Sequence, residues 1–223
     1  MKQKNKNKKG NKNMKQISNL DFNNINVFNH KSLCVNITKQ IVQPIFFNKV
    51  FNQYMFDCHN ILNEYLTNNQ YNSQSQKSIR GKINEYLILL YLNHKGIKYL
   101  YPQSYLFFIP DIKFDLVLFT KTKRIIAFNF KTCLRERYKQ SIVEGEQIKK
   151  LDTRFGFYLL TNDESETQRL NNKIKNGKVQ SINKVINLFS NSANLFLQNL
   201  LTNQFIPFSP INLIKKMVRS NDK

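Results

Sequence analysis

The types and spacing of Asp115 and Lys131 would allow these two residues to act together in one catalytic site. They lie in two apolar segments, 105–119 and 124–132, which the short polar connection 120–123 separates. Apolar segments joined in this way predict a β-hairpin. Paired residues in a hairpin with this turn have numbers that sum to about 244–246, so Asp115 should face Asn129 and Lys131 on one side of the sheet.

A strand carboxylate beside a lysine suits metal-dependent hydrolysis of a phosphodiester. Magnesium prefers hard oxygen ligands, and a carboxylate and a scissile phosphate supply them. The lysine can position the attacking water or offset the charge that develops on the phosphorane. Asn129, the residue opposite Asp115, is a neutral amide and therefore a weak magnesium ligand.

The segment from about Gly81 to Thr161 resembles the PD-(D/E)XK nucleases, whose motif runs from an Asp to a strand that ends in acid-x-Lys. Residues 131–144, KTCLRERYKQSIVE, are similar to the type II restriction endonucleases that read CCGG-type and interrupted CC/GG sequences. The resemblance implies that a Glu on the following helix replaces the missing strand acid. Glu144, thirteen residues after Lys131, matches that position. Asp115 and Glu144 would then hold Mg²⁺, and Lys131 would orient the water.

Arg135, Glu136 and Arg137 occupy the spacing at which this branch carries an Arg-acid-Arg run. Arginine binds guanine O6 and N7 bidentately, and a carboxylate accepts a hydrogen bond from cytosine N4. Each good contact of this kind is worth about 1–3 kcal/mol of discrimination. The run therefore predicts a reader of G·C pairs, although such residues on their own commonly form an exposed helix face with local ion pairs.

Glu85 lies on an otherwise mostly apolar helix, where a carboxylate needs a partner. The resemblance implies that a helix carboxylate upstream of the hairpin also enters the site, which makes Glu85 a candidate for assisting the metal. The alternative is a structural ion pair with Arg80 or Lys82.

Asp111 is the second choice for the metal-binding aspartate. It follows Pro110 and matches the literal Pro-Asp pair of the motif. The hairpin register places it opposite Cys133 and Arg135, beyond the lysine, which favours Asp115.

The charge of the chain indicates a polyanionic partner. Its 223 residues contain 35 Lys and Arg against 14 Asp and Glu, a formal charge of +21. The first sixteen residues carry seven lysines and no acid, which leaves 21 − 7 = +14 on the rest. A field of this sign concentrates nucleic acid. Three widely spaced cysteines predict neither a disulfide framework nor a zinc knot.

The expected fold is α/β, a restriction-endonuclease-like core with a mixed central sheet flanked by helices. Residues 1–16 are expected to form a disordered basic arm and residues 17–223 a single nuclease domain, with N-terminal helices in 31–70 and a catalytic core in 79–161. The patterns predict two helices interrupted at Pro44, a loop over 68–78, a helix from Ser78 to a cap at Gly96, a helix over 135–151, a strand over 155–161 and a helix over 183–189. Late helices around 183–202 are candidates for a dimer surface or for core.

These patterns together lead us to expect a magnesium-dependent type II restriction endonuclease that acts on double-stranded DNA as a homodimer. No apolar run approaches the ~18 residues of a membrane helix, and the N-terminus has no hydrophobic signal core, so a cytoplasmic protein without membrane contact is expected. A cognate DNA methyltransferase would accompany such an enzyme. The rivals are a catalytically decayed nucleic-acid-binding protein and a repair or recombination nuclease that recognises DNA structure.

Overall fold

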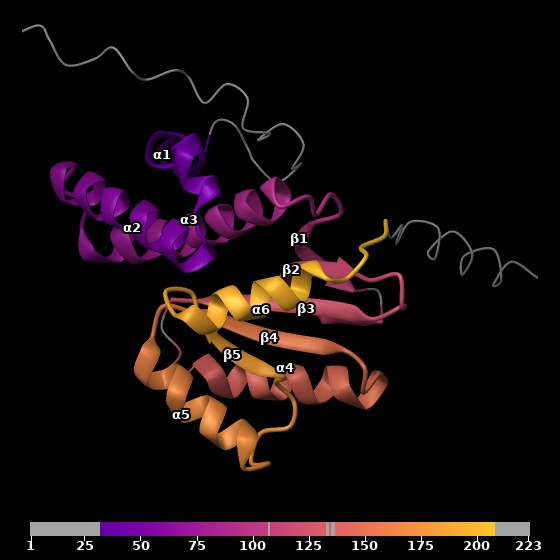
Figure 1. Ribbon diagram of the computed structural model, residues 1–223. Coiled ribbons are helices and arrows are strands. Elements are labelled where there is room, and N and C mark those ends of the chain that lie inside the picture. The colour runs from indigo at the N-terminus through magenta and orange to yellow at the C-terminus, as the bar shows by residue number, and fades with distance from the viewer. Residues whose placement is uncertain (1–31, 107, 133, 135–136, 208–223) are drawn as a thin grey trace, which may run out of the picture.

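The chain forms an α/β protein with a five-stranded mixed sheet flanked by helices (Figure 1). The computed structural model describes residues 32–106, 108–132, 134 and 137–207. The predicted basic arm, residues 1–16, lies outside this range. The elements are α1 Leu33–Ile41, a 3₁₀ helix Pro44–Asn48, α2 Phe51–Asn68, α3 Ser73–His94, β1 Tyr101–Leu106, β2 Ile109–Phe119, β3 Ile125–Lys131, α4 Arg137–Leu151, β4 Gly156–Thr161, α5 Glu164–Lys175, β5 Lys184–Asn187 and α6 Asn191–Leu201.

The N-terminal helices agree with the predicted interruption at Pro44. That proline opens the short 3₁₀ helix between α1 and α2, where its missing N–H costs nothing. The loop predicted over 68–78 was wrong from Ser73 onward, because α3 begins there. The Asn72 side chain caps this helix by accepting a hydrogen bond from the Ser75 N–H. Gly96 ends the helix region with a φ of 91°, as its predicted capping role requires.

The predicted hairpin is confirmed in its register. β2 and β3 pair antiparallel, with Leu116 opposite Phe128 and Val117 opposite Ala127, so the paired numbers sum to 244. The single strand predicted over 105–119 was wrong at its start, because the chain reverses between Leu106 and Ile109 and makes β1 a separate strand. The run contains no glycine or asparagine at this turn, so its apolar pattern concealed the reversal.

The second half of the sheet is parallel: β4 pairs with β3, and β5 pairs with β4. The helix predicted over 183–189 was wrong, because Lys184–Asn187 is strand β5. Val185 and Ile186 are both buried, on opposite faces of the sheet. A strand that is buried on both faces gives a continuous apolar run, which periodicity does not distinguish from a buried helix.

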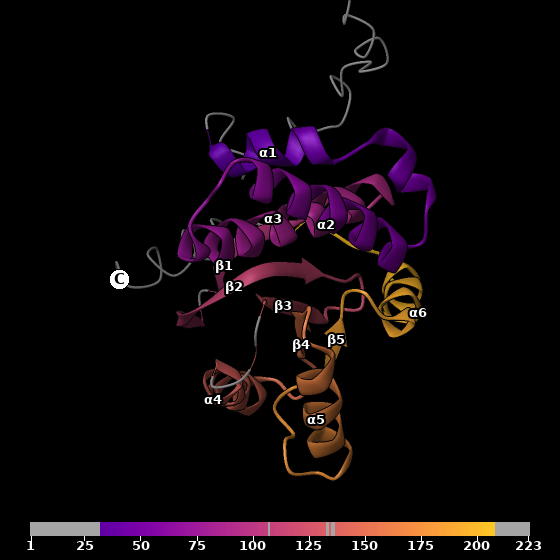
Figure 2. The same ribbon diagram turned by 90° about the vertical axis from the view of Figure 1, so that its left-hand side faces the viewer.

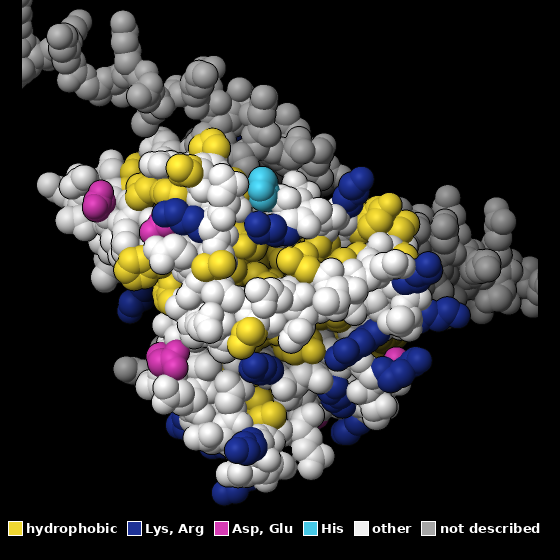
Figure 3. All heavy atoms as spheres, in the orientation of Figure 1, with side chains coloured by type: hydrophobic (Ala, Val, Ile, Leu, Met, Phe, Trp, Pro, Cys, Tyr) yellow, Lys and Arg dark blue, Asp and Glu magenta, His cyan; other side chains and the backbone are white. Residues whose placement is uncertain are grey.

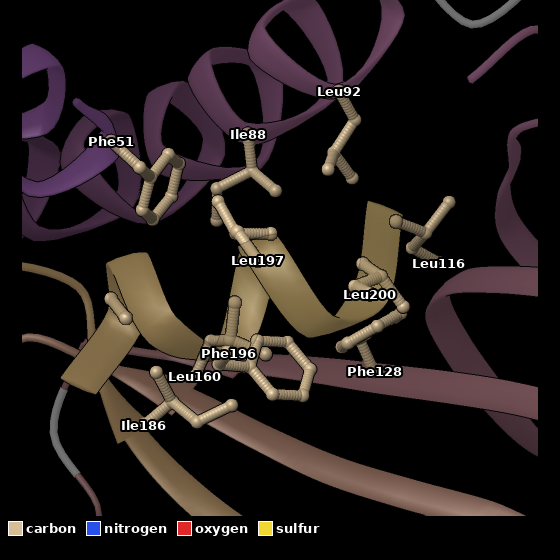
Figure 4. Close-up of a pocket in the computed structure, with 11 residues that line it drawn as sticks. Phe51, Ile88, Leu92, Leu116, Phe128, Leu160, Ile186, Phe196, Leu197 and Leu200 are labelled. Carbon is tan, nitrogen blue, oxygen red and sulfur yellow. The ribbon is translucent and has the colours of Figure 1, made fainter. Parts of the chain in front are cut away.

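Two hydrophobic clusters hold helices to the two faces of the sheet (Figure 2). The larger cluster joins α1, α2, α3 and α6 to one face. Figure 4 shows α6 between α2, α3 and the sheet, with Leu197 and Leu200 directed into this cluster. That face of α6 is therefore core, one of the two roles predicted for the late helices, and the dimer surface stays a prediction. The smaller cluster packs α4 and α5 on the opposite face.

Within the described residues, no helix is both long enough and apolar enough to cross a lipid bilayer.

His59 on α2 and Asn84 on α3 form a buried hydrogen bond between the two helices. Burial lowers the pKa of His59, and the bond to Asn84 only partly opposes this effect. The unfolded chain therefore binds the proton more readily than the folded chain near the usual histidine pKa of about 6.5. The stability that the neutral imidazole contributes is complete above that pH and is lost as the pH falls below it.

We expect the free energy of unfolding to decrease as the pH falls below about 6.5, because the pKa of His59 is lowered in the folded chain. His59→Gln keeps a polar partner for Asn84 and removes the titration. Urea unfolding at several pH values should show a flatter pH dependence in this variant. An unchanged slope would mean that His59 does not cause the acid destabilisation.

Candidate active site at the end of the β2–β3 hairpin

Asp115 lies just beyond the last ladder pair of β2 and β3, at the point where the two strands stop pairing. Its backbone N–H donates to the Asn129 side-chain oxygen at 3.3 Å. Its Oδ2 accepts from the Phe130 N–H at 2.7 Å. The carboxylate and the Asn129 amide therefore lie across from one another, as the hairpin register predicts.

The Asn129 amide also reaches Glu144 on α4. Its Nδ2 donates to Glu144 Oε2 at 3.1 Å, and Gln140 Nε2 donates to Glu144 Oε1 at 2.7 Å. Asn129 is 2% exposed, so its amide oxygen and its amide nitrogen are both hydrogen-bonded where water has little access. Asn129, which stands at the motif's acid position, thus connects strand β2, which carries Asp115, to helix α4, which carries Glu144.

Lys131 ends β3 two residues after Asn129, on the same side of the strand, and its side chain is half-buried. Its positive charge opposes the rise in pKa of both Glu85 and Glu144. The ammonium therefore acts electrostatically on carboxylates that α3 and α4 bring from opposite faces of the sheet.

Gln103 of β1 links Glu85 to Asp115. Its Nε2 donates to Glu85 Oε2 at 2.8 Å and to Asp115 Oδ1 at 3.1 Å. The backbone of Gln103 has a φ of 51°, a left-handed conformation that is uncommon for a residue with a side chain. The sequence did not indicate this residue, because β1 itself was not predicted.

Glu85 also pairs with Lys82, whose Nζ lies 2.6 Å from Glu85 Oε2. One of the two structural partners foreseen for Glu85 is therefore present. The other, Arg80, instead donates hydrogen bonds to Asn63 and Gln76. Glu85 holds both its structural ion pair and a place beside Asp115, so the two interpretations of this residue are compatible.

Burial raises the pKa of both Glu85 and Glu144, and the negative charge of Asp115 raises each further. The Lys82 ion pair opposes the rise at Glu85. The hydrogen bond from Gln140 and the charge of Lys131 oppose it at Glu144. Partly desolvated carboxylates with perturbed pKa values at one place are typical of functional sites. A cation placed among them would relieve their mutual repulsion.

The donor set fits one kind of metal ion. Within the described residues, no group of three or more His, Cys, Asp or Glu side chains that could hold a metal is present. An ion caged by protein ligands alone therefore does not fit. Magnesium commonly binds through one or two carboxylates and completes its shell with water and substrate phosphate. Asp115 and Glu144 suit that mode.

The remaining predicted residues lie outside this network or outside the described residues. Asp111 is exposed and precedes Asp115 by four residues on β2. Within the described residues, no hydrogen bond joins Asp111 to the network around Asp115. Arg135, Glu136 and the side chain of Arg137 lie outside the described residues, so their predicted contacts with base pairs stay predictions. The backbone at Arg137 begins α4.

Gly145 lets α4 approach the loop before β5. A Cβ at this position would lie 2.7 Å from the Ser181 carbonyl oxygen and 2.9 Å from the Ser181 Cβ. Real Cβ atoms do not come this close, so a side chain would force the helix away from the loop. Glu144 precedes this glycine and would move with it.

We expect Gly145→Ala to destabilise the fold, although alanine favours a helix by about 1 kcal/mol over glycine. Overpacking against backbone costs about 1–3 kcal/mol and should exceed that gain. Gly81→Ala is the matched control, because its Cβ would meet only Thr132 Cγ2, at 4.0 Å. Urea unfolding should rank Gly81→Ala at or above the unmodified protein and Gly145→Ala below it. Equal stability of the two variants would contradict the close contact.

Comparisons of the chain with protein-family models, with curated proteins and with solved structures found no match.

Proposed function

We propose that the protein is a magnesium-dependent endonuclease of the type II restriction class that cleaves double-stranded DNA at a G·C-containing site. One observation carries the proposal. Asp115, Asn129 and Glu144 form a continuous hydrogen-bonded group at the end of the hairpin, and the charge of Lys131 acts on it. The resemblance to PD-(D/E)XK nucleases pointed to the same residues.

Each residue has a distinct part in the proposed reaction. Asp115 and Glu144 hold the ion, which when bound would polarise the scissile phosphate and activate water. Lys131 orients the attacking water and offsets the charge that develops on the phosphorane. Glu85, anchored by Lys82 and Gln103, assists from the α3 side. In-line attack by water would leave a 5′-phosphate and a 3′-hydroxyl, as the resemblance implies.

The chain outside the site supports a DNA substrate. The formal charge of +21 attracts a phosphate backbone and makes binding depend on salt. Cleavage of both strands of a palindrome requires two active sites related by a twofold axis, so a homodimer is part of the proposal. A methyltransferase that modifies the same site would protect the host DNA.

Asn129 favours one rival, a non-cleaving nucleic-acid-binding protein that keeps a nuclease-like site. Its amide oxygen is occupied by the Asp115 N–H and its nitrogen by Glu144, so the amide serves structure where an acid would bind metal. In this alternative the charge of the chain still drives binding. The two proposals differ in whether DNA is cut.

Purified protein incubated with supercoiled plasmid and Mg²⁺ distinguishes them, with EDTA as the control. Discrete bands that require Mg²⁺ support the restriction proposal. Intact plasmid that is strongly retarded in a gel supports the binder. A smear, or cuts confined to branched DNA, would instead indicate the structure-specific repair nuclease.

A further inference from the structure

A surface hollow of about 370 Å³ lies at the other ends of the central strands. It opens between α6 and the beginnings of β3, β4 and β5. Its volume falls within the range of small-molecule sites. The lining residues that matter below are Arg124, Tyr158, Lys184, Phe196, Asn199 and Asn203.

Aromatic rings form one wall of this hollow. The rings of Tyr158 and Phe196 have centroids 5.0 Å apart and are tilted by 52°. Phe128 stacks on Tyr158 at 5.7 Å and supports it from the core. Tyr158 and Phe196 are half-buried, so the two rings are fixed and still accessible. Supported rings of this kind provide a stacking surface for a nucleobase.

Arg124 is held in place beside this wall. Its Nε donates to the Arg154 carbonyl at 3.1 Å, and its guanidinium contacts the Tyr158 hydroxyl at 3.4 Å. Gly156 makes this placement possible. A Cβ there would lie 2.9 Å from Tyr158 Cε2 and 3.2 Å from Arg124 Nη2. The glycine therefore lets the ring and the guanidinium lie directly against β4.

The charge of the hollow suits an anion. Arg124 and Lys184 are cations, and none of the described residues that line the hollow is an acid. Asn199 adds an amide that can both donate and accept hydrogen bonds, as the edge of a base requires. The Asn203 amide nitrogen donates to the Asn199 and Leu200 carbonyls, which leaves its oxygen to accept from a base. Lys and Arg also predominate over Asp and Glu on the face of the molecule shown in Figure 3.

We propose that this hollow binds a single nucleotide, with the base stacked on Tyr158 and Phe196 and the phosphate between Arg124 and Lys184. The site is separate from the candidate active site. β3 runs from Ile125, beside the hollow, to Lys131, and six strand steps span about 20 Å. The proposal goes beyond the proposed nuclease and does not depend on it.

The nucleotide has two possible sources, a free nucleoside monophosphate and an unpaired nucleotide of a nucleic acid. The shared chemistry is one accessible base with one phosphate. A fully paired duplex does not offer it, because its bases are stacked and paired.

The test is a titration followed by the side-chain amide signals of Asn199 and Asn203 in ¹H–¹⁵N spectra. Adenosine 5′-monophosphate should shift these signals and reach saturation, whereas inorganic phosphate alone should not reproduce the shifts. Lys184→Glu should weaken binding by roughly tenfold or more, about 1.4 kcal/mol. The exposed Lys175 on α5 supplies the control, and Lys175→Glu should leave the affinity essentially unchanged.

A DNA hairpin with one extrahelical adenine and its fully paired counterpart identify the source. Tighter binding of the extrahelical hairpin than of the monophosphate assigns the site to nucleic acid, and the reverse order assigns it to free nucleotide. Three results would overturn the proposal: no shift with either ligand, equal shifts with phosphate alone, or equal loss of affinity in the Lys184 and Lys175 variants. Plasmid cleavage is measured separately, so a nuclease without this site and a site without nuclease activity are both recognisable.

Discussion

Lys131→Ala and Asp115→Ala should each abolish magnesium-dependent cleavage of plasmid DNA. Asp115 is half-buried and its carboxylate is positioned by Gln103 and by the Phe130 N–H, so alanine removes a held carboxylate from the proposed metal site. Lys131, on strand β3 of the hairpin, is the cation whose charge acts on the carboxylates of the candidate site. Loss of a group that stabilises transition-state charge costs about 10²–10³-fold in rate.

DNA binding should survive both changes, because under the proposed function the affinity would be spread over many phosphate contacts and either variant would alter at most one of them. Gel retardation should therefore remain within a few-fold of the unmodified protein. Lys175→Ala and Asp152→Asn are control variants, because neither residue takes part in the hydrogen-bond network around Asp115 and Asp152 pairs with Arg154. Normal cleavage by Lys131→Ala or Asp115→Ala would remove that residue from the mechanism.

Asn129→Asp should make the stability of the fold depend on magnesium. The variant loses the amide N–H that now donates to Glu144 and places a carboxylate against Glu144 and Asp115. Without a cation, the lost bond and the repulsion should cost about 1–3 kcal/mol. An ion shared by these groups would restore stability by mass action, about 2.7 kcal/mol at one hundred times its dissociation constant.

Thermal unfolding with increasing MgCl₂ measures this effect, with NaCl of equal ionic strength as the salt control. Asn129→Leu is the comparison variant, because it also loses the hydrogen bond to Glu144, together with the one from the Asp115 N–H, and adds no charge. Its melting temperature should fall and should gain no extra response to magnesium. If neither the unmodified protein nor Asn129→Asp gains stability from magnesium beyond the NaCl control, Asp115 and Glu144 do not share an ion.

Local patterns were sufficient to predict the hairpin. Apolar residues and a short polar turn predicted the parts of the two strands that pair, and their register sum of 244, continued by one residue, places Asp115 opposite Asn129. The position of Glu144 beside this end of the sheet is not set by a local pattern, because it depends on how α4 packs over the strands. The resemblance to a nuclease family supplied that expectation, and no local pattern contained it.

The errors have physical causes in burial. β5 looked like a helix because both of its faces are covered, and the end of β1 lay in an apolar run whose turn lacks glycine. The omission of β1 also hid Gln103, whose amide bridges two carboxylates only after three elements have come together. A polar residue whose role arises from tertiary contacts leaves no periodic signal in the sequence.

The candidate site takes its side chains from α3, β2, β3 and α4, and both hydrophobic clusters are needed to bring these elements together. A chain still emerging during synthesis contains the α3 glutamate and the hairpin before α4 exists. Such an incomplete chain lacks Glu144, and its Asp115 has no second carboxylate with which to share an ion. Under the proposed function, hydrolytic capacity would therefore arise only once the fold is complete, and unfinished chains would leave the genome of their own cell intact.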